Sequence, residues 1–427
     1  MLIQAQPRPS KSGLPLVVYI LAAGTFLMAT TEFLIAGLLP EVARDLGVSI
    51  SSAGLSITVF AIGMIVGAPL MAIATLRLSR RVTLGLALGV FAVGHVILGV
   101  SSSFALMLGV RFVTALATGA FWSVAAVVAA RAAGEAASVR AMGIVQAGGM
   151  LAVVLGVPIG AFAGQAMGWR GPFWALAVLA AVGALIVYRI VAPDDADHPT
   201  PSIRAELAGL CNPRVWLVLA SCAIVCGSSL SAYSFISPLL TDNAGLASAV
   251  IPFVLVGYGV GASVGSFLGG HFGSRRPYAV LFVSATMTFL VLAALCFFSH
   301  QPVATVVLVA LLGLFGMSTN PILVSMAVRF AGQAPTLAAS LTTSSFNLGT
   351  AIGSSIAGVA LETSLGATGP VAVGTAIAAL YFLPLGLLVA KERAASPGHA
   401  VEARPPSQTE ENDSVVSKTG AASPQST

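Results

Sequence analysis

Twelve apolar stretches, each long enough to cross a bilayer as a helix, divide this sequence. A hydrocarbon core about 30 Å thick requires about 20 helical residues. The stretches cover residues 14–38, 52–75, 82–101, 104–130, 142–165, 173–188, 215–237, 249–270, 278–299, 303–328, 337–361 and 371–390. Only helices satisfy the backbone of such stretches in lipid, so the pattern predicts an all-α integral membrane protein. Eleven stretches follow the first, which we therefore interpret as a retained helix rather than a secretory signal.

The distribution of charge predicts the orientation of the chain. Charged residues make up 8% of the sequence, whereas a soluble domain carries about 25%, which excludes most soluble enzymes. If the N-terminus lies inside, 17 of the 20 basic residues lie inside and only Arg44 and Arg170 lie outside. This asymmetry predicts that both termini are cytoplasmic. It also explains the net charge of +5 without a nucleic-acid partner.

A polar break between the sixth and seventh stretches divides the chain into two similar halves. Arg80 and Arg81 recur 195 residues later as Arg275 and Arg276. The predicted segments are a disordered cytoplasmic N-terminus (1–12), an N-terminal six-helix bundle (13–190), a cytoplasmic linker (191–213), a C-terminal six-helix bundle (214–390) and a disordered cytoplasmic tail (391–427). Two repeated bundles with a path between them are typical of a transporter.

Two fully charged side chains fall inside these stretches, Glu32 in the first and Arg111 in the fourth. Each costs about 2.5 to 3.5 kcal/mol at the bilayer centre on insertion scales, so its presence needs a reason. Glu32 lies eight residues before the predicted helix end near Pro40, and Arg111 lies seven residues after Phe104. At about 1.5 Å per residue, both side chains lie roughly 10 to 12 Å below the outer surface. We therefore expect that they can meet.

Two interpretations of these charges remain open. In the first, Glu32 snorkels to the interface and Arg111 is a structural residue held by neighbouring carbonyls. In the second, which we favour because intramembrane ionisable groups usually line a pathway, the pair couples transport to protons. Arginine keeps its proton at physiological pH, whereas a carboxyl group can release one. This interpretation makes Glu32 the proton carrier and Arg111 the residue that tunes it.

Aromatic and polar side chains are the candidates for a substrate pocket. Thr118 and Trp122 follow Arg111 at spacings of +7 and +4, on the same helical face. The other candidates are Met28 and Phe33 beside Glu32, and Tyr233, Phe235, Tyr258, Asn320, Phe346 and Asn347 in the second half. Buried amides in lipid need partners, so we give equal weight to a helix-bridging role for the two asparagines.

Glycines recur on the fifth stretch, at Gly149, Gly156, Gly160 and Gly164, with Pro158 between them. Small residues on one face let helices approach closely, and proline removes one backbone hydrogen bond. Tight packing explains this pattern, and so does a hinge between two rocking bundles.

Four segments together resemble the major facilitator superfamily, in particular its twelve-span drug:proton antiporters. They are TTEFLIAGLLPEVARDLGVS, RFVTALATGAFW, GVPIGAFAGQAMGWRGPFW and SFNLGTAIGSSIAG. The resemblance covers residues 14–390, and the chain looks most like bacterial chloramphenicol-resistance efflux proteins. It implies twelve helices in two six-helix bundles around a central cavity, in a bacterial inner membrane, with protons as coupling ion and no cofactor.

The same resemblance assigns roles to individual residues. Arg111 falls on the family's helix 4 arginine, which is implicated in proton coupling, and Glu32 on the helix 1 acid of related multidrug exporters. The GVPIG segment corresponds to a looser form of the helix 5 antiporter motif. The inner loop departs from the family pattern, because Ala72 and Leu76 replace its glycine and aspartate. The basic residues that remain are Arg77, Arg80 and Arg81, with Arg275 and Arg276 in the second copy. The resemblance therefore implies an inner gate loop that lacks the family's acid, and a role of these arginines in topology alone is the alternative.

These observations predict proton-coupled efflux of a small amphipathic drug such as chloramphenicol, an antibiotic-resistance function. The alternative is export of a sugar or purine nucleoside metabolite. An enzyme would need a nucleophile or metal cluster at membrane depth, but His95, His271 and His300 are scattered and no acid accompanies them. Cys222 and Cys226 have no neighbouring ligands, so we expect small apolar side chains and no metal site. We expect a monomer whose partners are its substrate and lipid.

Overall fold

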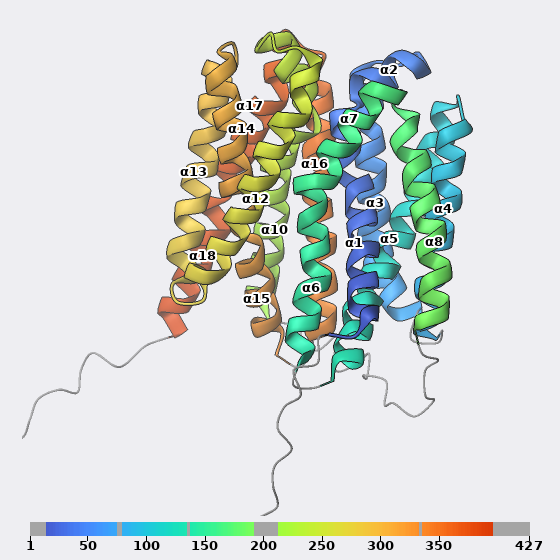
Figure 1. Ribbon diagram of the computed structural model, residues 1–427. Helices are drawn as coiled ribbons and strands as arrows, with labels where there is room; N and C mark the ends of the chain where they lie inside the picture. The colour runs from blue at the N-terminus through green and yellow to red at the C-terminus, as the bar shows by residue number, and fades with distance from the viewer. Residues whose placement is uncertain (1–13, 75–78, 135–136, 192–211, 333–334, 396–427) are drawn as a thin grey trace, which may run out of the picture.

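The computed structural model describes residues 14–74, 79–134, 137–191, 212–332 and 335–395, and all its regular elements are helical (Figure 1). Residues 1–12, most of the 191–213 linker, Arg77 and the tail from 396 onward lie outside the described residues. The described part of the chain has two halves, residues 14–191 and 212–395, which we call the first half and the second half.

The first half contains six membrane-crossing units, some of them built from more than one element. The elements are α1 (Leu16–Leu34), the 3-10 turn η1 (Ile35–Gly37), α2 (Leu39–Leu46), α3 (Ile50–Ala74), α4 (Arg80–Val100), α5 (Phe104–Ala133), α6 (Ser138–Leu151), the π-helical η4 (Ala152–Gly156), α7 (Val157–Met167) and α8 (Arg170–Ile190). Hydroxyl caps begin two of these helices: Ser79 accepts from the N–H of Val82, and Ser103 from that of Leu106.

The second half is divided into more pieces. Its elements are α10 (Pro213–Ser234), α11 (Ile236–Pro238), the π-helical η6 (Leu239–Asn243), the 3-10 turn η7 (Ser248–Val250), α12 (Ile251–Gly273), α13 (Pro277–Phe298), α14 (Pro302–Met317), α15 (Asn320–Ala331), α16 (Pro335–Leu361), the 3-10 turn η8 (Gly366–Thr368), α17 (Gly369–Leu380) and α18 (Phe382–Ala395).

Eleven spans among the described residues are long and apolar enough to cross a membrane. The remaining predicted stretch, 337–361, is the 27-residue helix α16, which packs against α3 and α10. Serines and threonines make α16 less apolar than the others. All twelve predicted stretches are therefore helical, with ends that differ by a few residues.

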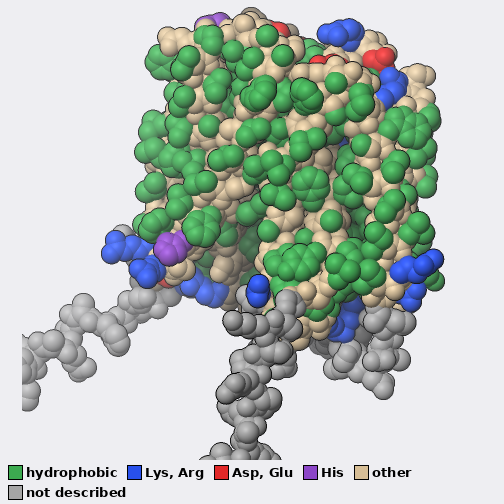
Figure 2. All heavy atoms as spheres, viewed as in Figure 1, with side chains coloured by type: hydrophobic (Ala, Val, Ile, Leu, Met, Phe, Trp, Pro, Cys, Tyr) green, Lys and Arg blue, Asp and Glu red, His purple; other side chains and the backbone are tan. Residues whose placement is uncertain are grey.

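The sides of the molecule are covered with apolar side chains, as Figure 2 shows. Phe267, Phe297 and Val303 are between 73 and 79% exposed, an arrangement that water would penalise but that lipid favours. Lys and Arg side chains gather toward the end of the molecule where α1 begins and α18 ends (Figures 1 and 2). This surface is that of a multi-pass membrane protein.

Prolines explain where the helices of the second half break. A proline has no N–H for the carbonyl four residues earlier, so the helical ladder is interrupted there. The helices α10, α14 and α17 end at Ser234, Met317 and Leu380, each four residues before Pro238, Pro321 and Pro384. In the first half, η4 contains Val154, four residues before Pro158, and the π-helical turn absorbs the missing bond.

Two carbonyls freed by prolines in the first half accept hydrogen bonds from serines of the second half. Pro69 lies inside α3, and the carbonyl of Ile65 accepts from the Ser344 hydroxyl of α16 at 3.0 Å. Pro40 follows Ala36 by four residues, and the Ala36 carbonyl accepts from Ser237 of α11 at 3.0 Å. Side-chain hydroxyls commonly satisfy freed backbone groups in membrane helices. Each of these bonds ties the two halves together.

The halves also touch where α12 crosses η4. A Cβ atom added to Gly259 would lie 2.5 Å from the Val153 oxygen and 2.7 Å from the Val154 Cα. Only glycine permits this backbone-to-backbone approach.

Candidate functional site

A cavity lies between the halves, with Glu32 in its wall. Its lining comes from α1 and η1, α3, α10 and α16, and consists of Glu32, Phe33, Ala36, Ile57, Phe60, Ala61, Leu230, Tyr233, Ser234, Asn347 and Thr350. The first half supplies mainly apolar and aromatic walls, and the second half supplies hydroxyls and an amide. Such a mixture suits a compound that is apolar over most of its surface and carries a few polar groups.

The Glu32 carboxyl group is poorly satisfied. Its Oε2 atom is buried and makes no hydrogen bond within the described part of the chain. An ionised carboxylate in such surroundings is costly, whereas a protonated one is far less so. These surroundings therefore penalise an ionised Glu32 carboxylate.

Arg111 is completely buried on α5 and is held by backbone groups. Its Nη1 donates to the Thr31 carbonyl at 3.0 Å and to the Thr31 hydroxyl at 3.3 Å, and its Nε donates to the Ser56 carbonyl at 3.3 Å. The guanidinium carbon lies 4.2 Å from the centre of the Phe60 ring, a cation–π distance. Its Nη2 is buried without a hydrogen-bond partner among the described residues.

The predicted meeting of Glu32 and Arg111 does not occur in this conformation. No ion pair within 4.0 Å joins them in the described ranges, and Arg111 contacts Thr31 instead. Successive residues of an α-helix point about 100° apart. Thr31 therefore faces α5 while Glu32 faces the cavity, and Phe60 lines that cavity as well as the arginine.

His95 on α4 belongs to the same cluster, although it was not among the predicted site residues. Its Nε2 lies 2.8 Å from the Thr31 Oγ1. Its position five residues before the end of α4 at Val100 places it near the depth of Glu32, which was the one available signal.

Of the ten predicted pocket residues, Phe33, Tyr233 and Asn347 line the cavity. Tyr258 lies behind it, its ring 4.4 Å from that of Tyr233. The remaining six lie elsewhere in the packing. Met28 and Thr118 are fully buried, Trp122 packs against the small cluster that contains Phe60, and Phe235 is buried in the hydrophobic core. Asn320 donates to the Met317 sulfur, and Phe346 packs in the second half.

Several residues of the cavity were not predicted from the sequence. Ser234 and Thr350 supply hydroxyls, and the Cys226 Sγ lies 3.4 Å from the Thr350 Oγ1. Phe60 on α3 could have been predicted as a pocket residue, because it is a large aromatic residue within a predicted membrane span. The small and aliphatic residues of the lining carry no signal in the sequence, because they resemble any lipid-facing position.

The glycines of the fifth span face α1, the helix that carries Glu32, and Leu38 just beyond η1. Cβ atoms on Gly160 and Gly164 would lie 2.6 Å from a Leu34 methyl carbon and 2.5 Å from one of Leu38. A Cβ on Gly156 would meet the Thr30 hydroxyl, while one on Gly149 would keep an ordinary 3.6 Å contact with Thr25. Close packing of α6, η4 and α7 on α1 thus explains three of these glycines, and Pro158 explains η4.

The basic residues of the inner loops are placed apart from the cavity. The Arg81 guanidinium lies 4.1 Å from the centre of the Tyr188 ring. Arg80 begins α4, and Arg275 and Arg276 are exposed between α12 and α13. Their role as a gate stays a prediction.

A polar clamp joins three elements at the opposite end of the molecule. Asp45 of α2 accepts hydrogen bonds from Trp169 Nε1 at 3.1 Å and from Arg170 Nη1, while Arg170 Nη2 donates to the Ser101 carbonyl at 2.8 Å. The hydrogen bonds from Arg170 and Trp169 lower the pKa of the Asp45 carboxyl. The clamp fixes the ends of α2, α4 and α8 to one another.

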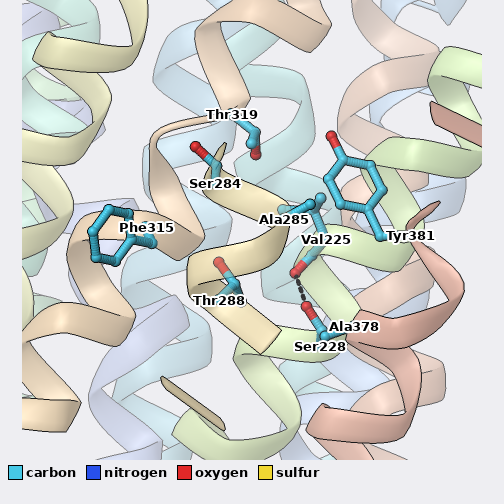
Figure 3. Close-up of a pocket in the computed structure, with 9 residues that line it drawn as sticks. All are labelled: Val225, Ser228, Ser284, Ala285, Thr288, Phe315, Thr319, Ala378 and Tyr381. Carbon is cyan, nitrogen blue, oxygen red and sulfur yellow. Dashed lines mark hydrogen bonds between the residues drawn. The ribbon is translucent and has the colours of Figure 1, made fainter. Parts of the chain in front are cut away.

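A second, smaller cavity lies within the second half (Figure 3). Its wall includes Ser228, Ser284, Thr288, Thr319 and Tyr381. It shares no lining residue with the Glu32 cavity, so it is not part of the site between the halves.

Known proteins resemble the chain over most of its length. Residues 21–236 and 219–420 each match the Major Facilitator Superfamily. A chloramphenicol resistance protein of Streptomyces lividans is 35% identical, over 84% of this chain and 92% of its own. The inner membrane transport protein YdhP of Escherichia coli O157:H7 is 31% identical, over 85% and 93%.

A solved structure shows the same fold. It is a bacterial homologue of the human lysosomal transporter Spinster, in an inward-facing and unoccupied conformation, and it is 16% identical with a TM-score of 0.67. The match covers 90% of this chain and 99% of that one. From the family match, the relatives and this fold it follows that the chain belongs to the major facilitator superfamily, whose members are membrane transporters and not enzymes.

Proposed function

We propose that this protein exports a small, largely uncharged amphipathic compound, chloramphenicol or one of similar chemistry, in exchange for protons. The observation that carries the proposal is the buried, unpaired Glu32 Oε2 in the wall of the cavity between the halves. A carboxyl group in this wall can exchange protons and can also contact a compound bound in the cavity. The two bundles then rock against each other about the site, so that the cavity opens to one side at a time.

The lining supports an amphipathic substrate. Phe33, Phe60 and Tyr233 offer rings for an aromatic compound, and Ser234 with Asn347 offers hydrogen bonds to amide or hydroxyl groups. A polyanion would find no cation in this lining. The chloramphenicol resistance protein of Streptomyces lividans adds independent support for this substrate class.

Orientation and location complete the proposal. The positive charge of the inner loops supports cytoplasmic N- and C-termini in a bacterial inner membrane, and Arg44 with Arg170 marks the outer side. The protein works as a monomer in this account, because each chain contains both halves of the path.

The substrate is tested by expression in a drug-sensitive host, with a panel of antibiotics, sugars and nucleosides. Chloramphenicol tolerance is expected to rise several-fold over a host that carries the Glu32→Gln variant at equal membrane abundance. If tolerance to sugars or nucleosides changes and chloramphenicol tolerance does not, the alternative of metabolite export replaces this substrate class.

A further inference from the structure

His95 is a fully buried imidazole that the proposed mechanism has not used. Its ring stacks on Phe91 at 3.9 Å and lies 5.7 Å from the ring of Phe173 on α8. The Nδ1 atom lies 2.7 Å from the Phe91 carbonyl oxygen, and the Nε2 atom lies 2.8 Å from the Thr31 Oγ1. Both ring nitrogens therefore have a partner, and one partner also contacts Arg111.

The direction of each hydrogen bond follows from the chemistry of these groups. A carbonyl oxygen only accepts, so Nδ1 carries a hydrogen and donates it to Phe91. In a neutral imidazole, Nε2 then has a lone pair and accepts from the Thr31 hydroxyl. The Thr31 oxygen in turn accepts from Arg111 Nη1. A directed chain runs from Arg111 through Thr31 to His95, and it requires a neutral ring.

The neighbouring threonines of α1 behave differently. Thr25 and Thr30 donate to the carbonyls of Leu21 and Phe26, four residues earlier on the same helix. This bond is the usual choice for a threonine in a membrane helix. The Thr31 hydroxyl points instead to His95, which leaves its oxygen lone pairs turned toward the guanidinium. The hydrogen bond to His95 thus sets the orientation of the Thr31 hydroxyl group that accepts from Arg111.

We propose that His95 is a positioning residue for proton coupling: through the Thr31 hydroxyl, its neutral ring holds Arg111 beside Glu32 without letting the two form an ion pair. The proposal rests on Glu32 as the proton carrier. A direct ion pair would keep the carboxylate ionised and remove it from proton exchange. With Nη1 fixed on Thr31 and Nε on Ser56, the cation stays close but separate.

Two variants at position 95 separate positioning from simple packing. His95→Phe keeps a planar ring and removes both nitrogens, whereas His95→Gln keeps an amide that reaches Thr31 and can accept its hydroxyl hydrogen. Proton-driven transport is expected to fall about tenfold in His95→Phe, the scale of one buried hydrogen bond, with a KM within about twofold. His95→Gln should recover most of the rate. A packing role alone predicts no rescue by glutamine.

Thr31 provides the second half of the test. Thr31→Val removes the hydroxyl with little change of shape, and Thr31→Ser keeps it as a control. Because His95 acts through this hydroxyl, adding His95→Phe to Thr31→Val should reduce transport no further. Independent, multiplying losses would overturn the proposal, as would normal transport by a well-folded His95→Phe protein.

A spectroscopic measurement tests the chain without reference to transport. The chain contains five histidines, so the signal of His95 is identified by its loss in His95→Gln. Nitrogen-15 chemical shifts of the purified protein should show a neutral ring with hydrogen on Nδ1 across about pH 5 to 8. Hydrogen on Nε2, or a charged ring, contradicts the proposal. If Glu32→Gln leaves proton exchange intact, the proposed function fails, but this measurement still decides the role of His95.

Discussion

A rotation of about 100° separates Thr31 from Glu32 on α1 and gives these adjacent residues different tasks. Thr31 holds the guanidinium of Arg111 with its carbonyl and its hydroxyl, while Glu32 faces the cavity with an unpaired oxygen. Phe60 contacts the Arg111 guanidinium and also lines the cavity that contains Glu32.

Replacement of Arg111 by lysine tests whether charge alone is sufficient. A lysine amine is a single point donor and cannot reach the Thr31 and Ser56 carbonyls as the guanidinium does. Transport by Arg111→Lys is expected to fall about tenfold or more, and Arg111→Ala should lose both transport and folded protein. Rates for each variant are compared in proteoliposomes at equal protein content. Full activity of Arg111→Lys would mean that the charge, and not the bridge, matters.

The clamp at Asp45 predicts a dependence of stability on pH. Its pKa is lowered by Arg170 and Trp169, so the clamp stabilises the fold above the ordinary aspartate pKa of about 3.9 and is lost as pH falls through the lower folded value. Because the pair is partly exposed, Asp45→Asn should destabilise by less than about 1 kcal/mol at neutral pH. Thermal unfolding in detergent should show this difference at pH 7 and lose it in strong acid. A difference that persists unchanged in acid rules out this origin.

Individual residues show how much of the site can be predicted from the sequence. Hydropathy predicts similar depths for Glu32 and Arg111, because depth is a count along a helix, and Arg111 does contact Thr31, the residue next to Glu32. Contact depends on how each helix is rotated, and the apolar residues surrounding α1 on all sides leave no periodic signal for that rotation. Because helix rotation is not predicted, the sequence also did not indicate that the His95 ring faces Thr31.

At the scale of elements, proline positions decide both the breaks and some of the joints between the halves. Proline lacks the N–H that would donate to the carbonyl four residues earlier. At that carbonyl the helix ends, a π-helical turn forms, or a side chain from another helix donates instead. For Ile65 and Ala36 the donor is a serine from the other half. Apolar stretches predict that a helix is present but say nothing of these breaks. Pro238, Pro321 and Pro384 were visible in the sequence and marked three of them.

Ser344→Ala tests one of these joints. Its loss leaves the Ile65 carbonyl unpaired in a partly buried position, which should reduce stability by about 1 kcal/mol or more. Ser340→Ala is the matched control, because Ser340 donates to Leu337 within its own helix at 2.9 Å. Thermal unfolding of the two variants in detergent should show a loss only for Ser344→Ala. Equal midpoints for both would mean that the bond between the halves contributes nothing.

At the scale of the whole molecule, the two halves surround one cavity and meet along α3 with α16 and along α12 with η4. The first half contributes the acid, the arginine and the histidine, while the second half contributes hydroxyls, an amide and the Tyr233 ring. In the proposed mechanism the first half therefore carries proton coupling, both halves line the substrate cavity, and motion of one half against the other links the two processes. The family fold was predictable from its motifs, whereas the lining of the cavity required the structure.

The central claim is that Glu32 carries the exchanged proton, and proton movement in proteoliposomes tests it most directly. Addition of substrate to vesicles with the wild-type protein should move protons, and Glu32→Gln should abolish this movement while the protein remains folded in the membrane. Glu41→Gln is the control, because Glu41 also has a buried unpaired oxygen but lies on α2, outside the cavity. Loss in Glu32→Gln alone is the predicted result. Substrate-induced proton movement that survives in Glu32→Gln would contradict the account.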